Sequence, residues 1–181
     1  MWPGGYGQAS YILQSCSELP HHGRIVDFAC GCGVGTVAAL RTKIPSVLAI
    51  DICPHATMST LMNVQLNFSE EDVYSRFNYL TQNIIGTKVG EVIQNRDLVY
   101  CGDVLYDDSF ASSLLPWLQE LVSEGIDVIV SDPGRWVLQE MSKSDRDALI
   151  KPVKTVEFEK WFSSQNHGLV SCELYKILPP P

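Results

Sequence analysis

Apolar and polar residues follow two alternating periods along this chain, which predicts strands and helices in turn. Short apolar runs typical of buried strands cover residues 24–29, 46–51, 77–81, 97–101 and 126–130. Apolar residues recur at helical spacing over residues 5–18, 34–42, 54–67 and 110–122. Strands and helices are therefore expected to alternate through most of the chain.

The helix predicted over residues 54–67 begins with Pro54, which suits the first helical turn. We expect it to bury one broad apolar face. That face would consist of Ala56, Met58, Leu61, Met62, Val64 and Leu66.

The last part of the chain contains two further apolar runs, over residues 153–158 and 169–177. They predict an antiparallel pair joined by a polar loop, after a short helix capped by Ser144 or Asp145. The whole pattern predicts an α/β fold, a Rossmann-like three-layer sandwich whose seven-stranded sheet is mostly parallel and ends in a C-terminal antiparallel hairpin. We expect residues 1–181 to form a single domain.

Composition narrows the classes of partner. The net charge of −8 argues against a broad nucleic-acid surface, which needs clustered Lys and Arg. No uncharged apolar run approaches the roughly 18–20 residues that span a bilayer. We therefore expect neither nucleic acid nor membrane as a partner, while an acidic chain is compatible with a basic protein.

The six cysteines are scattered, and several lie inside apolar runs. This distribution is typical of reduced thiols packed as small apolar side chains, not of a disulfide framework. Cys30 and Cys32 form a short pair, but no second pair stands at zinc-site spacing. We expect no metal.

Polar and small residues follow the ends of the predicted parallel strands. These positions are Ala29, Cys30 and Gly31, then Asp51, Asn83, Gly102 with Asp103, and Asp132. Ligands of open α/β sheets bind beyond the carboxyl ends of the strands. The sequence therefore predicts a binding site at this edge of the sheet.

A glycine loop follows the first strand, and the second strand ends in Asp51 about 20 residues later. This combination suits the ribose of either NAD or S-adenosylmethionine. The dinucleotide fingerprint, however, requires a glycine where Thr36 stands, and the loop has no basic residue to meet a phosphate. S-adenosylmethionine is therefore the expected cofactor, with a nicotinamide oxidoreductase as the alternative.

The segment Gly102–Tyr106 follows the fourth strand, where a methyl acceptor would meet the donor. Asp103 could aim a lysine amine by a hydrogen bond, and Tyr106 could shield it with an aromatic wall. The alternative is that Asp103 caps the following helix and Tyr106 fills the core. Asp107 and Asp108 extend the acidic run, which favours a helix start over a metal cluster.

Several motifs carry a family resemblance. They are Trp2-Pro3-Gly4-Gly5, Val26-Asp27-Phe28, Gly31-Cys32-Gly33, Asp51-Ile52, Gln82-Asn83-Ile84, Gly102 to Asp107 and Asp132-Pro133-Gly134-Arg135. With them the chain resembles the seven-β-strand (class I) S-adenosylmethionine-dependent protein methyltransferases. Within that class it is most similar to the branch of the electron transfer flavoprotein β-subunit lysine methyltransferases.

The resemblance implies a role for each site residue. Trp2, Ala29, Cys30 and Gly31 would line the donor pocket, Asp51 would hold the ribose hydroxyls, and Asn83 and Gly102 would flank the adenine. Asp103 and Tyr106 would be the catalytic residues that receive the lysine. The chain departs from the family pattern at Ala29, where a glycine is usual, and at Leu105, where an aromatic is usual. The second departure is expected to affect acceptor positioning.

The resemblance also implies a protein substrate, the electron transfer flavoprotein β-subunit, a mitochondrial matrix location and a monomer. A cytoplasmic location, another acceptor on the same fold and a non-catalytic binding module are the alternatives. The first residues show no signal peptide, and structured-looking sequence begins abruptly at Trp2. We therefore expect that a family N-terminal segment is missing.

Overall fold

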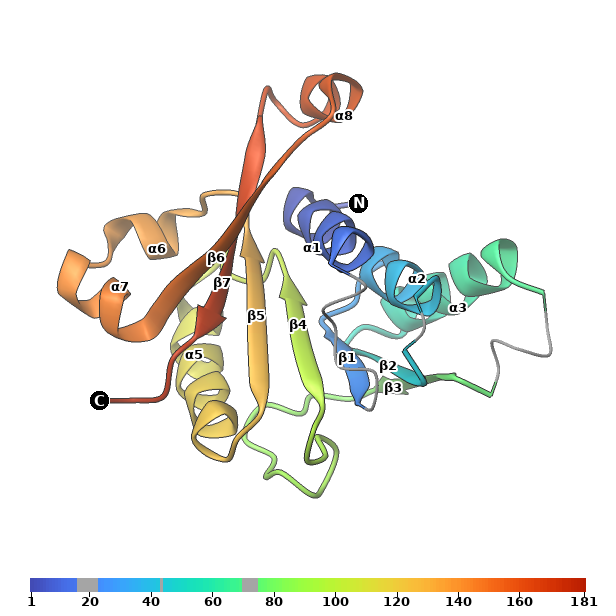
Figure 1. The fold of residues 1–181 in the computed structure, drawn as a ribbon, viewed down its shortest axis with the longest axis horizontal. Helices are drawn as coiled ribbons and strands as arrows, with labels where there is room; N and C mark the ends of the chain where they lie inside the picture. Colours follow the sequence, from blue (N-terminus) through green and yellow to red (C-terminus); the bar gives the residue numbers. More distant parts are fainter. Residues whose placement is uncertain (16–22, 43, 70–74) are drawn as a thin grey trace.

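The structure, a computed structural model, describes residues 1–15, 23–42, 44–69 and 75–181. Its centre is a seven-stranded sheet in the order β3-β2-β1-β4-β5-β7-β6 (Figure 1). The strands are β1 (Arg24–Phe28), β2 (Ser46–Asp51), β3 (Phe77–Thr81), β4 (Leu98–Gly102), β5 (Asp127–Asp132), β6 (Ile150–Glu157) and β7 (Ser171–Ile177). The predicted α/β sandwich with a mostly parallel sheet is confirmed.

Strands β1 to β5 are parallel, and β1 lies between β2 and β4. The chain moves outward from β1 to β3 and then returns to place β4 on the other side of β1. The carboxyl ends of β1 and β4 therefore meet at the point where the strand order reverses, which is where such sheets bind ligands. Strands β6 and β7 form the expected antiparallel pair beside β5.

Helices cover both faces of the sheet (Figure 1). One face carries α1 (Pro3–Gln14), α2 (Val34–Leu40) and α3 (Pro54–Asn67), which contact one another in sequence. The other face carries α5 (Asp108–Ser123). Successive residues of β1 serve the two faces in turn, since Ile25 packs with the first set of helices and Val26 with α5.

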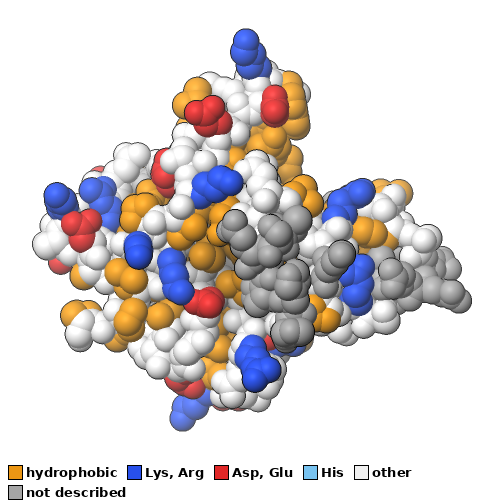
Figure 2. Space-filling model, viewed as in Figure 1, with side chains coloured by type: hydrophobic (Ala, Val, Ile, Leu, Met, Phe, Trp, Pro, Cys, Tyr) orange, Lys and Arg blue, Asp and Glu red, His pale blue; other side chains and the backbone are white. Residues whose placement is uncertain are grey.

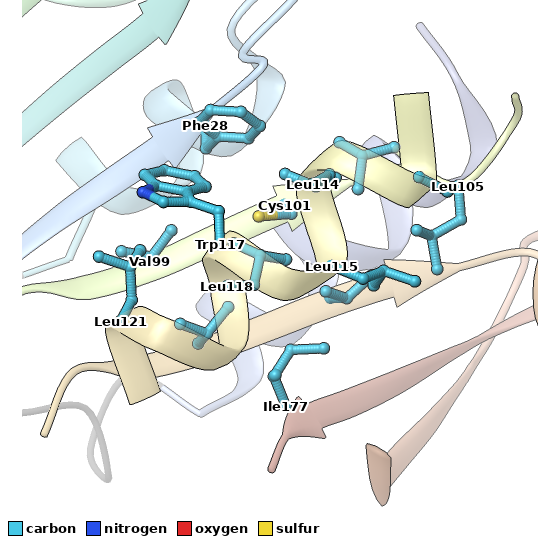
Figure 3. Close-up of a cluster of buried hydrophobic side chains, with 14 of the residues drawn as sticks. Phe28, Val99, Cys101, Leu105, Leu114, Leu115, Trp117, Leu118, Leu121 and Ile177 are labelled. Carbon is cyan, nitrogen blue, oxygen red and sulfur yellow. The ribbon is translucent and has the colours of Figure 1, made fainter. Parts of the chain in front are cut away.

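The core on the α5 face is built from leucines at helical spacing and from Trp117 (Figure 3). Trp117 is 2% exposed, and its ring lies 5.3 Å from that of Phe28 on β1. Its indole Nε1–H donates to the carbonyl of Thr87, so its one polar atom is satisfied. Burying these side chains anchors α5 on this face of the sheet, against β5 and β7.

The hairpin of β6 and β7 reaches across to α1 through a cluster of aromatic rings. Its connecting helix α8 (Lys160–Gln165) supplies Phe162, whose ring stacks on Tyr6 of α1 with centroids 4.2 Å apart. Phe158 meets the same tyrosine ring edge-on at 5.5 Å. The cluster attaches the C-terminal hairpin to the N-terminal helix.

The sequence missed or misplaced several short elements. Helix α8 stands where a loop was expected, and helix α6 (Trp136–Glu140) lies in a stretch for which no element was predicted. Helix α7 (Lys143–Leu149) is capped by Ser142, so the expected caps Ser144 and Asp145 were wrong. The first helix was expected to reach residue 18, and its predicted end lies outside the described residues.

The prediction for α3 was wrong about which side is buried. Met58, Met62 and Leu66 are 52%, 56% and 80% exposed, whereas Thr57 and Thr60 are buried with Val64. The helix packs on a polar loop, so hydroxyl groups are needed on its inner face. The candidate site shows what they contact.

Among the described residues, no helix has the length and apolar content to cross a membrane. Figure 2 shows Lys and Arg side chains spread singly over one face, with acidic and hydrophobic side chains between them. The described cysteines Cys30, Cys32, Cys53, Cys101 and Cys172 are all free thiols, as expected. Cys16 lies outside the described residues.

Candidate active site

A cavity of about 1010 Å³ opens at the carboxyl edge of the sheet. Residues that follow β1, β2, β3, β4 and β5 line it, together with the residues before α1. Of the residues that the sequence singled out for the site, Cys30 and Asp132 do not line this cavity; those that do are Trp2, Ala29, Gly31, Asp51, Asn83, Gly102, Asp103 and Tyr106. The topology therefore brings together residues up to 133 positions apart in the chain, from Trp2 to Arg135.

The loop after β1 places left-handed backbone next to the cavity. Ala29 has φ +56°, Gly31 has φ +55° and Gly33 has φ +75°. A Cβ on Gly31 would meet no protein atom within 4 Å, so its open side is available to a ligand. A Cβ on Gly33 would lie 2.5 Å from the Thr60 side chain, so that glycine is required by helix packing instead.

Threonine and asparagine side chains of α3 donate hydrogen bonds to the backbone of this loop. The Thr60 hydroxyl donates to the Gly31 carbonyl at 3.0 Å, and the Asn63 amide donates to the Cys32 carbonyl at 2.8 Å. Loop carbonyls that leave the sheet need such partners, because a buried acceptor without one is costly. This need explains why the inner face of α3 is polar.

Asp51 ends β2 directly beside the glycine loop. One of its carboxylate oxygens, Oδ2, accepts from the Gly31 N–H at 3.0 Å, and Oδ1 accepts from the Cys53 N–H at 2.9 Å. Each oxygen has a further acceptor position, and the side chain is partly exposed to the cavity. The carboxylate is thus fixed in place and still able to accept from two hydroxyl groups.

Cys30 is buried in the protein and does not line the cavity. Its side chain is 7% exposed, and its thiol lies 3.3 Å from the Thr60 hydroxyl. Burial raises its pKa, because the thiolate would be poorly solvated. The Cys30 N–H donates to the Ile50 carbonyl at 3.0 Å, so this residue connects the loop to β2 and does not face the cavity.

Asp27 is a buried acid beneath the glycine loop. It is 3% exposed and accepts from Gln8 of α1 at 2.8 Å and from the Thr36 hydroxyl of α2 at 2.6 Å. Burial raises its pKa to about 6 in spite of these hydrogen bonds. Thr36, which occupies the last glycine position of a dinucleotide fingerprint, therefore donates a hydrogen bond to a buried acid and does not contact the cavity.

Asn83 follows β3 and Gly102 ends β4, two strands that are separated in the sheet by β2 and β1. The Asn83 Oδ1 accepts from the Ile85 N–H at 3.1 Å, which leaves its amide N–H₂ as a donor toward the cavity. A Cβ on Gly102 would lie 2.4 Å from the Gln8 amide oxygen and 3.0 Å from the Gly5 Cα. Gly102 is therefore required by the close approach of α1.

Asp103 adopts a left-handed backbone with φ +62° and is 6% exposed. Its Oδ2 accepts from the Gly4 N–H at 3.0 Å, and its Oδ1 accepts from Arg135 Nε at 2.7 Å. Its own N–H donates to the Ser131 carbonyl at 2.9 Å. The carboxylate is therefore held by α1 and by the segment that follows β5.

The alternative roles weighed for this segment are not the ones that the structure shows. Helix α5 is capped by Asp107, whose carboxylate accepts from the Phe110 N–H at 2.8 Å, and not by Asp103. Tyr106 is 60% exposed and stacks on the Phe110 ring at 5.9 Å, so it does not fill the core. These contacts assign no ligand role to the acidic run, and no group of three or more possible metal ligands gathers among the described residues.

Leu105 faces away from the cavity. It is 1% exposed and packs in the core behind α5, as Figure 3 shows. The departure from the usual aromatic therefore lies in the core, and the expectation that it affects acceptor positioning finds no contact to support it.

The Trp2-Pro3-Gly4-Gly5 motif begins α1 against the Asp103 turn. A Cβ on Gly4 would lie 2.5 Å from the Asp103 backbone N and 2.6 Å from the Ser131 carbonyl. Only glycine fits this approach. Trp2 precedes the helix at the rim of the cavity and is 71% exposed.

Arg135 was not among the predicted site residues, although its place beyond a strand end suggested that it binds an acidic group or stabilises the Asp132 turn. It lines the cavity and pairs with Asp103, whereas its turn is closed by Asp132, whose Oδ2 accepts from the N–H groups of Gly134 and Arg135 at 2.9 Å each. The other oxygen of Asp132 has no partner among the described residues, and burial raises the pKa of this carboxyl to about 6. The signal in the sequence was a charged residue just beyond a strand end.

The cavity thus has two chemically different ends. One offers a glycine loop and a fixed carboxylate, and the other offers an Asp–Arg pair next to an exposed aromatic ring. Arg135 is the only Lys or Arg among the described residues that line the cavity, and it is paired. A diphosphate would find no free cation there, whereas a ribose and a cationic or amine group would each find a carboxylate.

Comparison with known proteins agrees with this chemistry. A family model described as Ribosomal protein L11 methyltransferase (PrmA) matches residues 11–132. The "Electron transfer flavoprotein beta subunit lysine methyltransferase" of Danio rerio is 35% identical over 135 residues, which cover 74% of this chain and 48% of that protein. The protein of the same name from Mus musculus is 35% identical over 179 residues, covering 98% of this chain and 65% of that protein.

The chain spans about half of the length of the first of these relatives and about two thirds of the second. Among solved structures, the magnesium protoporphyrin IX methyltransferase of Synechocystis PCC 6803 with bound SAH is similar in fold. It has a TM-score of 0.66 and 15% sequence identity, and the match covers 97% of this chain and 82% of that one.

Proposed function

Because the chain belongs to the ribosomal protein L11 methyltransferase (PrmA) family, we propose that it transfers a methyl group from S-adenosylmethionine to a lysine side chain of a protein. The observation that carries the proposal is the cavity itself. It joins a carboxylate suited to a ribose at one end to a buried carboxylate beside an exposed aromatic ring at the other.

The donor fits the glycine-loop end of the cavity. The open side of Gly31 allows close approach, the free acceptor positions of Asp51 suit the two ribose hydroxyls, and the Asn83 amide can donate to an adenine nitrogen. S-adenosylmethionine carries no phosphate, which agrees with the lack of a free cation among the described lining residues. When bound, this cofactor supplies a methyl group on a cationic sulfonium.

The acceptor fits the Asp103 end. Asp103 can accept a hydrogen bond from an incoming amine and so aim its lone pair, while Tyr106 forms an aromatic wall at the mouth. The Tyr106 face can also contact a methylated ammonium product. Because displacement at a methyl group is in line, the main contribution of these residues is orientation.

For the substrate we propose the electron transfer flavoprotein β-subunit. The names of the Danio rerio and Mus musculus relatives support it. We propose the mitochondrial matrix as the location of the reaction, as the resemblance to this branch of methyltransferases implies. Subcellular fractionation of the tagged protein would test the location.

The test of the function uses isotope-labelled S-adenosylmethionine and purified electron transfer flavoprotein. We expect label on lysine of the β-subunit, located by mass spectrometry. Label on another residue or another protein would contradict the proposed substrate but would still support methyltransferase activity. Absence of donor binding in calorimetry would overturn the enzyme in favour of a binding module.

A donor-site variant makes the same experiment sharper. Asp51→Asn should weaken donor binding by about tenfold, because an amide cannot accept from both ribose hydroxyls and from two backbone N–H groups. At saturating donor, transfer should approach the wild-type rate. An unchanged donor affinity would remove Asp51 from the proposed ribose contacts.

A further inference from the structure

We infer that Arg135 is a positioning residue that keeps the acceptor amine uncharged, an inference that rests on the proposed lysine transfer. Arg135 would act through Asp103: it holds this carboxylate in place as a hydrogen-bond acceptor and offsets its negative charge. The chemistry requires both properties, because the amine must be aimed and must also keep its lone pair.

The geometry of the pair supports the first property. Arg135 Nε donates to Asp103 Oδ1 at 2.7 Å, and the Gly4 N–H donates to Oδ2 at 3.0 Å. The Asp103 side chain is 2% exposed, whereas that of Arg135 is 30% exposed on the cavity wall. A carboxylate has about four acceptor positions, so Asp103 can still accept from an amine in the cavity.

The charges around the pair support the second property. Asp132 lies close enough to Asp103 and Arg135 to interact with both charges, and its pKa of about 6 leaves it ionised above neutral pH. Among the described residues, the other titratable or charged groups near the pair are Tyr106 beside Asp103, Glu173 and Cys172 on β7, Tyr175 further along β7 and Arg146 on α7. Helix α1, which packs on the same turn, has no Asp, Glu, Lys, Arg or His. Arg135 is therefore the cation that offsets two buried carboxylates.

Removing that cation would change the protonation of the acceptor. A lysine in solution has a pKa near 10.4, and nearby carboxylates favour its ammonium form still further. A nearby guanidinium opposes this effect. With Arg135 in place, the ammonium can lose its proton to water, and the nitrogen then bonds to the methyl carbon as the carbon–sulfur bond breaks. The products are a methylated ammonium and a neutral thioether.

The experiment measures kcat and KM of Arg135→Gln for purified electron transfer flavoprotein from about pH 6 to about pH 10, which brackets the expected titration of the amine. We expect the acid limb of kcat to move up by roughly one pH unit. The KM of Arg135→Gln near neutral pH should equal that of the wild type or be lower, because the variant still binds the ammonium form of the lysine. The kcat of the variant should recover as the pH rises.

Two matched variants separate charge from shape. Arg135→Lys keeps the charge but loses the planar fork, so its acid limb should stay within about 0.3 pH units of the wild type while kcat falls. Arg146→Gln removes the same charge from α7, where this side chain donates to the Leu138 carbonyl and does not line the cavity. Its acid limb should not move.

A further variant covers the case in which Arg135→Gln leaves Asp103 unpaired and does not fold. The double variant Asp103→Asn with Arg135→Gln removes both charges, so its weakened activity should show an acid limb near that of the wild type. A loss by the same factor at every pH in Arg135→Gln, or a shifted limb in the double variant, overturns the inference.

The failure of the inference can be told from the failure of the proposed function. If the wild type methylates lysine and the limb of Arg135→Gln does not move, only the role of Arg135 is wrong. If the wild type methylates no lysine at any pH, the proposed function has failed and the inference fails with it.

Discussion

The two ends of the cavity are built in different ways. At the glycine-loop end, Asp51 accepts from Gly31 and Cys53, which are 20 and 2 positions away in the chain. At the other end, Asp103 accepts from Gly4 and Arg135, which are 99 and 32 positions away. One end is formed by a continuous stretch of chain, and the other is assembled from three separate segments.

This difference has a consequence for what each end depends on. The glycine loop is supported by its own strand, by α2 and by α3. The Asp103 turn depends on the N-terminus of α1 and on the turn after β5, so disturbance of either segment should reach the carboxylate. The following predictions, from the largest expected effect to the smallest, test whether the two ends are as separate as their contacts indicate.

Asp103→Asn should separate the two ends most clearly. An amide in place of the carboxylate presents an N–H₂ group, which cannot accept a hydrogen bond. The proposed hydrogen bond from the lysine amine to residue 103 is therefore lost. We expect transfer to fall by about 100-fold or more, the size of a modest loss of orientation. Donor affinity, measured by calorimetry, should stay within about twofold of the wild type. An equal loss of donor binding would mean that the two ends are not separate.

The pH dependence of stability should report on Asp27, which connects the glycine loop to α1. Burial raises the pKa of this carboxyl from 3.8 to about 6, so the folded state binds the proton more tightly. The contribution of Asp27 to stability is therefore fully present below about pH 4 and is lost as the pH rises through 6. The loss is on the order of 3 kcal/mol.

Urea unfolding of the wild type and of Asp27→Asn at several pH values measures this effect. The variant has no group to titrate, so its free energy of unfolding relative to the wild type should rise between about pH 4 and about pH 6.5. Taking the difference removes the parallel contribution of Asp132, whose pKa is also about 6. A difference that stays constant with pH would show that Asp27 does not titrate in this range.

Gly4→Ala should disturb the Asp103 end through packing alone. The added Cβ would lie 2.5 Å from the Asp103 backbone N, where neither backbone can yield easily. We expect a loss of about 2 kcal/mol in the free energy of unfolding, with reduced transfer. Gly5→Ala is the matched control, because its Cβ would meet only a methyl group of Val34 at 3.2 Å. Equal effects of the two substitutions would contradict the close approach at Gly4.

Ala29→Gly should produce the smallest change, and in the opposite direction. Ala29 has φ +56°, which strains a residue with a Cβ. Glycine relieves the strain but loses more entropy on folding, so we expect a net gain of about 0.5 kcal/mol in the free energy of unfolding. Thermal unfolding would measure it. A lower stability would mean that the alanine methyl group contributes more by packing than its strained backbone costs.

Most element positions and the mostly parallel sheet could be predicted because burial leaves a period in the sequence. Strands β1, β2 and β4 are short, mostly apolar runs, and the leucines of α5 recur at helical spacing. Helix α3 failed for a physical reason. Its methionines suggested an apolar inner face, but the loop beneath it presents carbonyl groups, and Thr60 and Asn63 satisfy them.

The sequence by itself determined that Gly31 and Asp51 meet, because a glycine loop followed about 20 residues later by an acid at the next strand end has a recognisable spacing. It also pointed to Asp103 and Tyr106, since they follow a strand end. Only the tertiary structure decided what surrounds them: Gly4 and Arg135 beside the carboxylate, Leu105 in the core, Cys30 behind the loop. No spacing encodes those contacts, because the folding of the sheet and α1 brings distant segments within hydrogen-bond reach.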